Sequence, residues 1–345
     1  MNFLYRITIL AAGLASLLHA QSWPDFPDLT GPYLGQKPPG EVPELFAPGI
    51  VNTGMYTRDI AISSAGDEIY FCVTLPGFNF ATILYTRILA DKWTEPEVVP
   101  YMDNPRYFYF EPHISADGRK LFFLSNQPDF AAGDTAGGDE DIWVMERSGD
   151  TWERPYNLGG PVNTDSSEFY PSLTRDGTLY FTRQVKNGRK SWIYRSRLVD
   201  GIYTRPERLG PHVNSGTSQY NAFIDPDEHF IIVPTNGRSD SFGGTDYYIV
   251  FRNYDDTWTG PVNLGSRINT RRGQDHSAFV SPDGKYFFFM SVRTPLDDES
   301  YRVKTTYTLL KTLYMNPGNG NSNMYWMRSG FIEDLRREAY GARSE

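Results

Sequence analysis

A unit with a period of roughly 50–60 residues recurs along this chain, and such a period is typical of one blade of a β-propeller. Each copy has a short strand, a turn rich in Asp and Gly, an apolar strand, a variable loop and a third strand. The apolar second strands occur five times, as IYFCVT, LFFLSN, LYFTRQ, FIIVPT and YFFFMSV. Because these runs are apolar at nearly every position, they indicate strands that are buried on both faces.

The fourth strand of the unit occurs only four times behind the other three. Its copies are WTEPEVV, WERPYNL, YTRPERL and WTGPVNL, whereas the fifth unit continues into FIEDLRREAY. The segment Val42–Thr53 supplies the missing piece, because its ending VNT matches the connectors NLGGPVNT, LGPHVNSG and NLGSRINT. A closed ring in which this segment completes the last sheet explains both counts and removes the exposed sheet edges.

We therefore expect an all-β, five-bladed β-propeller of four-stranded blades over residues 40–330. Residues 1–20 combine Arg6, an apolar run and Ala20 in the pattern of a secretory signal peptide. We expect export to the periplasm or the outside of the cell, and no membrane span, because the apolar run is short. Residues 21–39 are expected to form a Pro-rich leader, and residues 331–345 a helical tail.

The composition excludes several classes of function. The formal net charge is −9, and an acidic chain without a basic run fits neither nucleic acid nor an anionic membrane as a partner. The single cysteine, Cys72, allows neither an intramolecular disulfide nor a cysteine-based metal site, and it is expected to be a small buried residue. The sequence has no H-E-x-x-H, P-loop or G-x-S-x-G motif, and no cofactor is expected.

Several segments carry a family resemblance. They are the S-x-DG turns before an aromatic strand, the third-strand openings GGDEDIW and GGTDYY, and the end segments Pro32–Thr53 and Asn316–Leu335. With these marks the chain resembles the TolB-like, WD-repeat-like propellers of exported bacterial proteins. The resemblance implies a propeller over almost the whole mature chain. It says little about function, because propellers host binding, scaffolding and catalysis alike.

The direction of the strands sorts the loops onto two rims of the expected ring. The connectors between blades and the loops between second and third strands share one rim, which we call the connector rim. The S-x-DG turns and the turns between third and fourth strands share the other, which we call the turn rim. The connector-rim loops vary, chiefly Ser125–Glu140 and Arg293–Ser322, and variable loops on a rigid scaffold often carry function.

The residues that enter each first strand lie on the connector rim, near the central channel. Their types differ between the copies, although a purely structural position would repeat one type. The candidate ligand-binding residues among them are Arg58, Asp59, Glu111, Glu168, Tyr170, Asn221 and His276. The alternative is that these side chains only hydrogen-bond the connectors to one another.

No metal site is predicted. A metal site would need at least two of His113, His212 and His276 to meet, with Asp or Glu completing the shell, but their spacing has no ligand signature. His229 is discounted because it lies at a turn. The acidic loop with Asp134, Asp139, Glu140 and Asp141 lacks the spacing of a calcium loop. Asp141 is instead expected to order the start of the third strand, as Asp246 would in the fourth unit.

Two functions fit these patterns. The favoured one is an exported, non-catalytic binding or scaffold protein that contacts a protein partner or a glycan through the connector rim. The alternative is a polysaccharide lyase or glycosidase that acts on an anionic polysaccharide at the channel mouth, with a base and an Arg that neutralises a uronate. The residues that could fill these roles are Tyr170, His276, Arg58 and Glu111. The aromatic residues that could stack on sugars are Phe78, Phe80, Tyr107, Phe108, Phe130 and Phe242. The ligand and the oligomeric state stay open.

Overall fold

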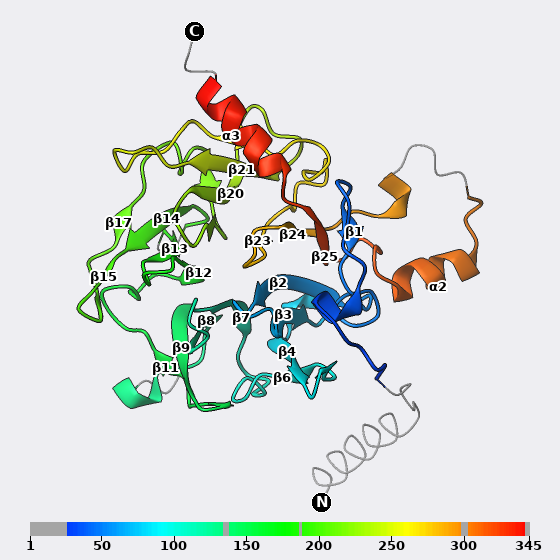
Figure 1. The fold of residues 1–345 in the computed structure, drawn as a ribbon, viewed down its shortest axis with the longest axis horizontal. Coiled ribbons are helices and arrows are strands. Elements are labelled where there is room, and N and C mark those ends of the chain that lie inside the picture. The colour runs from blue at the N-terminus through cyan, green and yellow to red at the C-terminus, as the bar shows by residue number, and fades with distance from the viewer. Residues whose placement is uncertain (1–25, 134–137, 186–187, 298–302, 342–345) are drawn as a thin grey trace, which may run out of the picture.

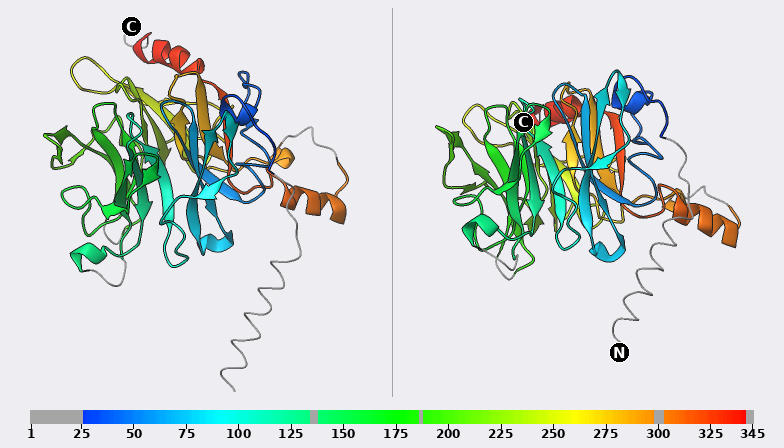
Figure 2. Two further views of the ribbon diagram at one scale, coloured as in Figure 1. Left: turned by 60° about the horizontal axis from the view of Figure 1, so that its bottom comes forward. Right: turned by 90° about the horizontal axis from the view of Figure 1, so that it is seen from below.

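The computed structural model describes residues 26–133, 138–185, 188–297 and 303–341. In these residues, five antiparallel sheets stand around a central axis as the blades of a propeller (Figure 1). Side views show a flattened ring whose strands run from one rim to the other (Figure 2). The predicted all-β fold and its five blades are confirmed. The predicted signal peptide, residues 1–20, lies outside the described residues.

Within each blade the first strand lies nearest the axis and the later strands follow outwards. The strands of the first blade are β2 (Tyr56–Ile62), β3 (Glu68–Thr74) and β4 (Ala81–Leu89). Those of the second are β7 (Tyr109–Ile114), β8 (Lys120–Ser125) and β9 (Asp141–Ser148), and those of the third are β12 (Glu168–Leu173), β13 (Leu179–Gln184) and β14 (Ser191–Ser196). The fourth has β18 (Ser218–Gln219) and β19 (Phe223–Ile224) in the first-strand place, then β20 (Phe230–Asn236) and β21 (Thr245–Phe251). The fifth has β23 (Ala278–Val280), β24 (Tyr286–Ser291) and β25 (Asn323–Arg328).

The second strands form the core of the ring. Every residue of β3 is buried, and β24 is buried at every position except Tyr286. A strand in this place has a neighbouring blade on each face, so both sets of its alternating side chains leave water. The fully buried rings of Tyr70, Phe123, Phe181 and Phe287 all come from these strands. The continuous apolar runs in the sequence therefore reflect burial between blades.

The fourth strand is interrupted wherever its motif contains a proline. Proline has no N–H to donate to a sheet, so the strand splits into short pieces on either side of it. The pieces are β5 (Lys92–Trp93) and β6 (Glu97–Val98), β10 (Thr151–Trp152) and β11 (Tyr156–Asn157), and β16 (Ile202–Tyr203) and β17 (Glu207–Arg208). In the fourth blade β22 (Val262–Asn263) follows a single bridge at Trp258, and in the third blade β15 (Leu198–Val199) forms a ribbon with β16. The motif tryptophans Trp93, Trp152 and Trp258 are buried, which supports their predicted structural role.

The N-terminal segment closes the ring. Strand β1 (Glu44–Leu45) pairs antiparallel with β25, with Glu44 opposite Trp326. The backbone N–H of Phe46 donates to the carbonyl of Met324 at 3.0 Å. The ring of Phe46 is fully buried, and its centroid lies 5.1 Å from that of Trp326. The segment that the repeat count singled out therefore completes the fifth blade.

The recurring ending VNT is a clamp on the third strand. Asn52 donates from Nδ2 to the carbonyl of Met324 at 2.9 Å and accepts from the N–H of Met324 at 2.9 Å. Three more asparagines bond to both backbone groups of one third-strand residue in the same way. These pairs are Asn163 with Ile142, Asn214 with Ile193, and Asn269 with Tyr247. The chain thus begins with the end of its repeat because that end holds the last blade together.

Short helices lie outside the five sheets. The 3-10 turns are η1 (Tyr33–Gly35), η2 (Pro76–Phe78), η3 (Phe130–Ala132) and η4 (Pro295–Asp297). Helix α3 (Phe331–Gly341) packs its Phe331 ring against Phe287, with centroids 5.4 Å apart. Helix α2 (Tyr307–Met315) lies within the segment Arg293–Ser322, which the sequence suggested only as a loop, and it projects beyond the ring (Figures 1 and 2). In the described part of the chain, no helix has both the length and the apolar character needed to cross a membrane.

Candidate functional site

One residue in each blade has a left-handed backbone where the first strand enters the channel. A positive φ costs a non-glycine residue about 1–2 kcal/mol, so five such residues at one place in the repeat need a reason. They are Asp59 (φ 51°), Glu111 (59°), Tyr170 (53°), Asn221 (52°) and Ser277 (65°). In the first three blades a β-bulge lies at this point, for example between Arg58 and Ile60. The fold therefore repeats one backbone shape around the channel while the side chains differ.

These side chains form a hydrogen-bonded circuit around the channel mouth. Arg58 of the first blade contacts Asp59 through Nε at 2.7 Å and Glu111 of the second blade through Nη2 at 2.8 Å. Asn221 of the fourth blade donates to Glu111 Oε1 at 3.2 Å and to Ser277 Oγ of the fifth blade at 3.1 Å. The hydroxyl of Ser277 donates to Asp59 and completes the circuit. Four of the predicted candidates thus meet, and they bond across the channel to one another.

Tyr170 supports this circuit from the third blade. Its backbone N–H donates to Glu111 Oε2 at 2.7 Å, and its hydroxyl donates to the carbonyl of Ala278 at 3.0 Å. Burial raises the pKa of Tyr170 well above its usual value. The hydroxyl is therefore a structural donor between the third and fifth blades.

His276 lies beside the circuit as a neutral imidazole. Burial and the charge of Arg58 hold its pKa well below the usual value. Because the Ser277 hydroxyl donates to Asp59, His276 Nδ1, which lies 3.1 Å from Ser277 Oγ, carries the hydrogen of that contact. This tautomer leaves Nε2 as an acceptor. The ring is edge-on to Tyr220, with centroids 6.0 Å apart.

Glu168 is the candidate that the structure keeps apart from the circuit. Its carboxylate accepts from the N–H and the hydroxyl of Thr164, at 2.8 and 2.6 Å, and from Arg183 Nε at 2.5 Å. Asp275 makes the same two bonds to Thr270, at 2.6 and 2.9 Å. These two carboxylates hold the connectors. The structural alternative, in which the candidate side chains only hold the connectors, therefore applies to Glu168. The residues of the circuit bond mainly to each other.

A pocket of about 380 Å³ opens above the circuit on the connector rim. The predicted candidates that line it are Arg58, Glu111, Asn221 and His276. Its aromatic walls are Phe78, Phe110, Phe169 and Tyr220, and its further polar groups are Glu140, Gln184, Arg189, Ser191 and Ser218. Sequence reasoning missed most of these as site residues. The signal was present, because Phe110, Phe169 and Tyr220 occupy the same place in their repeats as Arg58 and His276.

The floor of this pocket holds more acidic than basic side chains. Arg58 is held by two carboxylates, and its guanidinium carbon lies 5.1 Å from the centre of the Phe110 ring. Burial raises the pKa of Glu111 to about 8; Arg58 opposes the rise, whereas Asp59 and Glu140 add to it. Burial also raises the pKa of Glu140. The site can therefore offer aromatic faces, amide and imidazole groups, and carboxyl groups whose ionised forms a positively charged ligand would stabilise.

A larger hollow of about 500 Å³ lies between the second and third blades at the turn rim. Among its lining residues are Asp117 and Asp176, whose carboxylates are used by their own turns. Asp117 accepts from Ser115 Oγ at 2.6 Å, and Asp176 accepts from the N–H of Thr178 at 3.1 Å. We therefore place the candidate site in the smaller pocket, where polar groups of several blades converge.

The other histidines have separate structural partners in the described part of the chain. His113 Nε2 accepts from the N–H of Leu173 in the next blade at 3.1 Å, and burial lowers its pKa to about 4. Ser172 does the same for Ile224 one blade further on, at 3.0 Å. His212 Nδ1 lies 2.5 Å from the carbonyl of Trp258.

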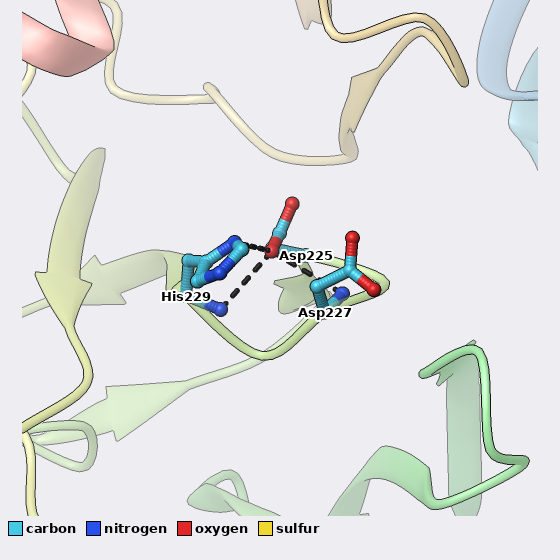
Figure 3. A group of neighbouring side chains, drawn as sticks. All are labelled: Asp225, Asp227 and His229. Carbon is cyan, nitrogen blue, oxygen red and sulfur yellow. Dashed lines mark hydrogen bonds and ion pairs between the residues drawn. The ribbon is translucent and has the colours of Figure 1, made fainter. Parts of the chain in front are cut away.

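A group of potential metal ligands is present at the DPDE turn, and its side chains are shown in Figure 3. It comprises Asp225, Asp227 and His229. Asp225 Oδ2 accepts from the N–H groups of Asp227 and His229, at 3.3 and 3.0 Å, and lies 2.9 Å from His229 Nδ1. The Asp227 carboxylate pairs with Arg175 of the third blade at 3.0 Å. These bonds shape the turn and join two blades, and we assign the group to that role.

The remaining predictions on the connector rim have mixed outcomes. Asp141 accepts from Asn157 Nδ2 at 2.7 Å and Asp246 from Asn263 Nδ2 at 3.0 Å, which orders the third strands as expected. Of the proposed sugar-stacking aromatics, Phe78 lines the pocket, whereas Tyr107 and Phe108 pack on the core between blades. Phe80 and Phe242 do not line the pocket. Asp134 and the side chain of Phe130 lie outside the described part of the chain.

Comparison with known proteins gives similarity of fold. No protein-family model and no curated protein sequence matches the chain. The chain is similar to TolB from Acinetobacter baumannii, with 13% identity over 80% of this chain and a TM-score of 0.42, and it spans 57% of that protein. It is similar to the gluconolactonase XC5397 from Xanthomonas campestris (14%, 80% of this chain, 85% of that chain, TM-score 0.45). It is also similar to a GH43 endo-arabinanase from Bacillus licheniformis (13%, 81% of this chain, 96% of that chain, TM-score 0.44). The fold assignment here rests on the strand pairing described above.

Proposed function

We propose that this chain is an exported binding protein that holds a short glycan in the channel-mouth pocket. The observation that carries the proposal is the pocket itself, in which aromatic walls surround a floor of oriented polar groups from four blades. A sugar ring presents C–H groups on its faces and hydroxyls at its edge. Aromatic side chains suit the faces, and the amide, guanidinium and imidazole groups suit the hydroxyls. The signal-like residues 1–20 support export.

The shape of the site favours a small ligand over a flat protein surface. Ligand pockets commonly have volumes of roughly 300–1,000 Å³, and this one, at about 380 Å³, suits one or two sugar units. A stable protein interface buries about 800 Å² on each partner, far more than the lining of a small hollow provides. The converging groups lie inside a hollow, where a flat surface would not reach them.

The circuit could serve only to close the channel, which is the simpler explanation. The chemistry of its residues argues against this role. A buried ion pair such as Arg58–Glu111 is weak evidence for stability, because desolvation offsets the attraction. Apolar side chains would close a narrow channel at lower cost. Strained backbone residues and buried charges gathered at one mouth are typical of functional sites.

Of the two enzymatic alternatives, a glycosidase fits the pocket better than a lyase. A lyase acting on uronates is not favoured, because Arg58 already binds two carboxylates and the Tyr170 hydroxyl is bonded in the interior. A glycosidase needs two carboxyl groups in one pocket, one of them with a raised pKa. Glu111 and Glu140 both line this pocket, and burial raises the pKa of each. These two residues are the acid and base that a glycosidase function would use.

A glycan array with the purified protein, followed by a reducing-end assay on every glycan that binds, tests the proposal. Binding without release of reducing ends supports the binding protein. Release that is lost in Glu111→Gln and Glu140→Gln, with binding retained, supports the glycosidase. If the array shows no glycan bound at any pH between 5 and 8, the proposal is wrong.

A further inference from the structure

We propose that the saccharide bound in the channel-mouth pocket carries a protonated amine, which Glu140 and the neighbouring aromatic walls receive. This inference rests on the proposed function and names the class of glycan. Three features of the pocket lead to it: a carboxylate without a partner among the described side chains, an excess of acidic over basic side chains, and aromatic rings in the lining.

The first feature is the position of Glu140. Its backbone carbonyl accepts from the N–H of Glu168 at 2.8 Å, which anchors the residue just before β9 and against the third blade. Its half-buried side chain lines the pocket. Within the described residues its carboxylate has no hydrogen bond or ion pair to another side chain. A carboxylate held in this way is an acceptor without a protein donor.

The second feature is the excess of acidic over basic side chains around the pocket. The carboxyl groups are Asp59, Glu111 and Glu140, and the facing cations are Arg58 and Arg189. Arg58 is already shared between two of the carboxyl groups, at 2.7 and 2.8 Å. Arg189 is exposed to water at the edge of the pocket. A ligand that brings one positive charge would favour the ionised forms of Glu111 and Glu140, whereas a uronate would oppose their ionisation.

The third feature is the aromatic lining. An ammonium group is attracted to the face of an aromatic ring within about 6 Å of its centre. The Arg58 guanidinium takes this place over Phe110, with 5.1 Å between its central carbon and the ring centre. Phe169 and Tyr220 also line the pocket. A carboxylate next to aromatic faces is a suitable environment for an amine, and N-acetylation of that amine would remove both attractions.

A pair of matched ligands tests this inference. The probes are a β-1,4-linked glucosamine tetramer and its fully N-acetylated counterpart, measured by isothermal titration calorimetry at pH 6 in low salt. We expect the amine form to bind at least about tenfold more tightly, a difference of about 1.4 kcal/mol. Raising the salt concentration should weaken binding of the amine form more than that of the acetylated form.

The variant Glu140→Gln keeps the shape of the side chain and removes its charge. We expect it to weaken binding of the amine form by about fivefold or more and to leave the acetylated form unchanged. The matched control is Glu146→Gln, because Glu146 lies towards the far end of β9, the strand that Glu140 precedes, on the turn rim, where it pairs with Lys120 at 3.0 Å. This control should bind both forms as the wild type does.

The outcomes separate this inference from the proposed function. Equal or tighter binding of the acetylated tetramer would overturn the inference and leave the glycan-binding function standing. An equal loss for both tetramers in Glu140→Gln would also overturn it, because Glu140 would then act through shape. If spermidine, an amine without a sugar, competes as well as the glucosamine tetramer, the pocket recognises amines alone, and the glycan proposal fails. If neither tetramer binds, the inference is overturned, and the glycan array decides the function.

Discussion

Ser277 and Asp59 are 218 residues apart in the sequence, and the hydroxyl of Ser277 donates a hydrogen bond to the carboxylate of Asp59. The bond joins the fifth blade to the first at the channel mouth. It belongs to the same closure that β1 and Asn52 make at the outer edge of the fifth blade. The ring is therefore fastened at both its inner and its outer circumference, and the candidate site depends on that closure.

Asn221 tests how much the circuit contributes to stability. Asn221→Ala removes two donated hydrogen bonds and keeps a Cβ at a φ of 52°, so we expect the free energy of unfolding to fall by about 1–3 kcal/mol. Asn221→Gly loses the same bonds but relieves the left-handed strain. We expect it to be up to about 1 kcal/mol more stable than the alanine variant. The greater conformational freedom of glycine in the unfolded chain reduces this gain. Urea denaturation measures both. A glycine variant less stable than the alanine variant by about 1 kcal/mol, the usual cost of glycine in the unfolded chain, would mean that the left-handed backbone carries no strain.

Closure by the N-terminal segment can be tested at Asn52. Asn52→Ala leaves the N–H and carbonyl of Met324 without their side-chain partner, and we expect a loss of about 1–3 kcal/mol, as for Asn163→Ala in the second blade. Deletion of residues 21–53 should expose the edge of β25 and cause aggregation. A deleted protein that stays monomeric and melts at the wild-type temperature would contradict the closed ring.

The turn rim should affect stability without affecting ligand binding. Asp117 and Asp283 accept from Ser115 and Ser281, each at 2.6 Å, and the pKa of each carboxyl lies below its usual value, although burial opposes the shift. Because the folded pKa is depressed, this contribution is present above the unfolded pKa near 4 and is lost as the pH falls below it. Asp117→Asn and Asp283→Asn should lower the melting temperature at pH 7 and change it less at pH 3. Loss of glycan binding in either variant at unchanged stability would place the site on the turn rim.

The buried imidazole of His113 should also make the stability of the protein depend on pH. Its pKa is lowered from 6.5 to about 4 because burial disfavours the imidazolium. The unfolded chain therefore binds more protons, so the contribution is complete above pH 6.5 and is lost as the pH falls towards 4, by about 3 kcal/mol. His113→Gln keeps an acceptor for the N–H of Leu173 and removes the titration. The stability difference between wild type and variant should shrink or reverse between pH 7 and pH 4.5. A constant difference over that range would show that His113 does not titrate in this way.

The sequence predicted the ring because its repeats are strict in number and in order. Arg58, Phe110, Phe169, Tyr220 and His276 occupy the same place in their repeats, yet only Arg58 and His276 among them were predicted as site residues. Their aromatic partners were missed because aromatic residues are common throughout this chain. The separate role of Glu168 could not be seen, since it depends on its bonds to Thr164.

Helix α2 was missed for a different reason. Its residues Tyr307, Leu310 and Tyr314 lie at helical spacing, but all three are exposed. An apolar pattern is readable as a helix when it matches a core, and this helix has no buried residue. The clamps were visible as a repeated Asn, but what they hold became clear only from the third strands opposite them.

The most direct test of the central claim is calorimetric titration of the tightest-binding saccharide from the array into four proteins. These are the wild type, Phe169→Ala, Tyr220→Ala and the control Tyr254→Ala, whose ring is exposed on the turn rim. We expect both pocket variants to lose about tenfold or more in affinity, which is about 1.4 kcal/mol, while the control binds as the wild type does. Wild-type affinity in both pocket variants, with all four proteins folded, would contradict a glycan site at the channel mouth.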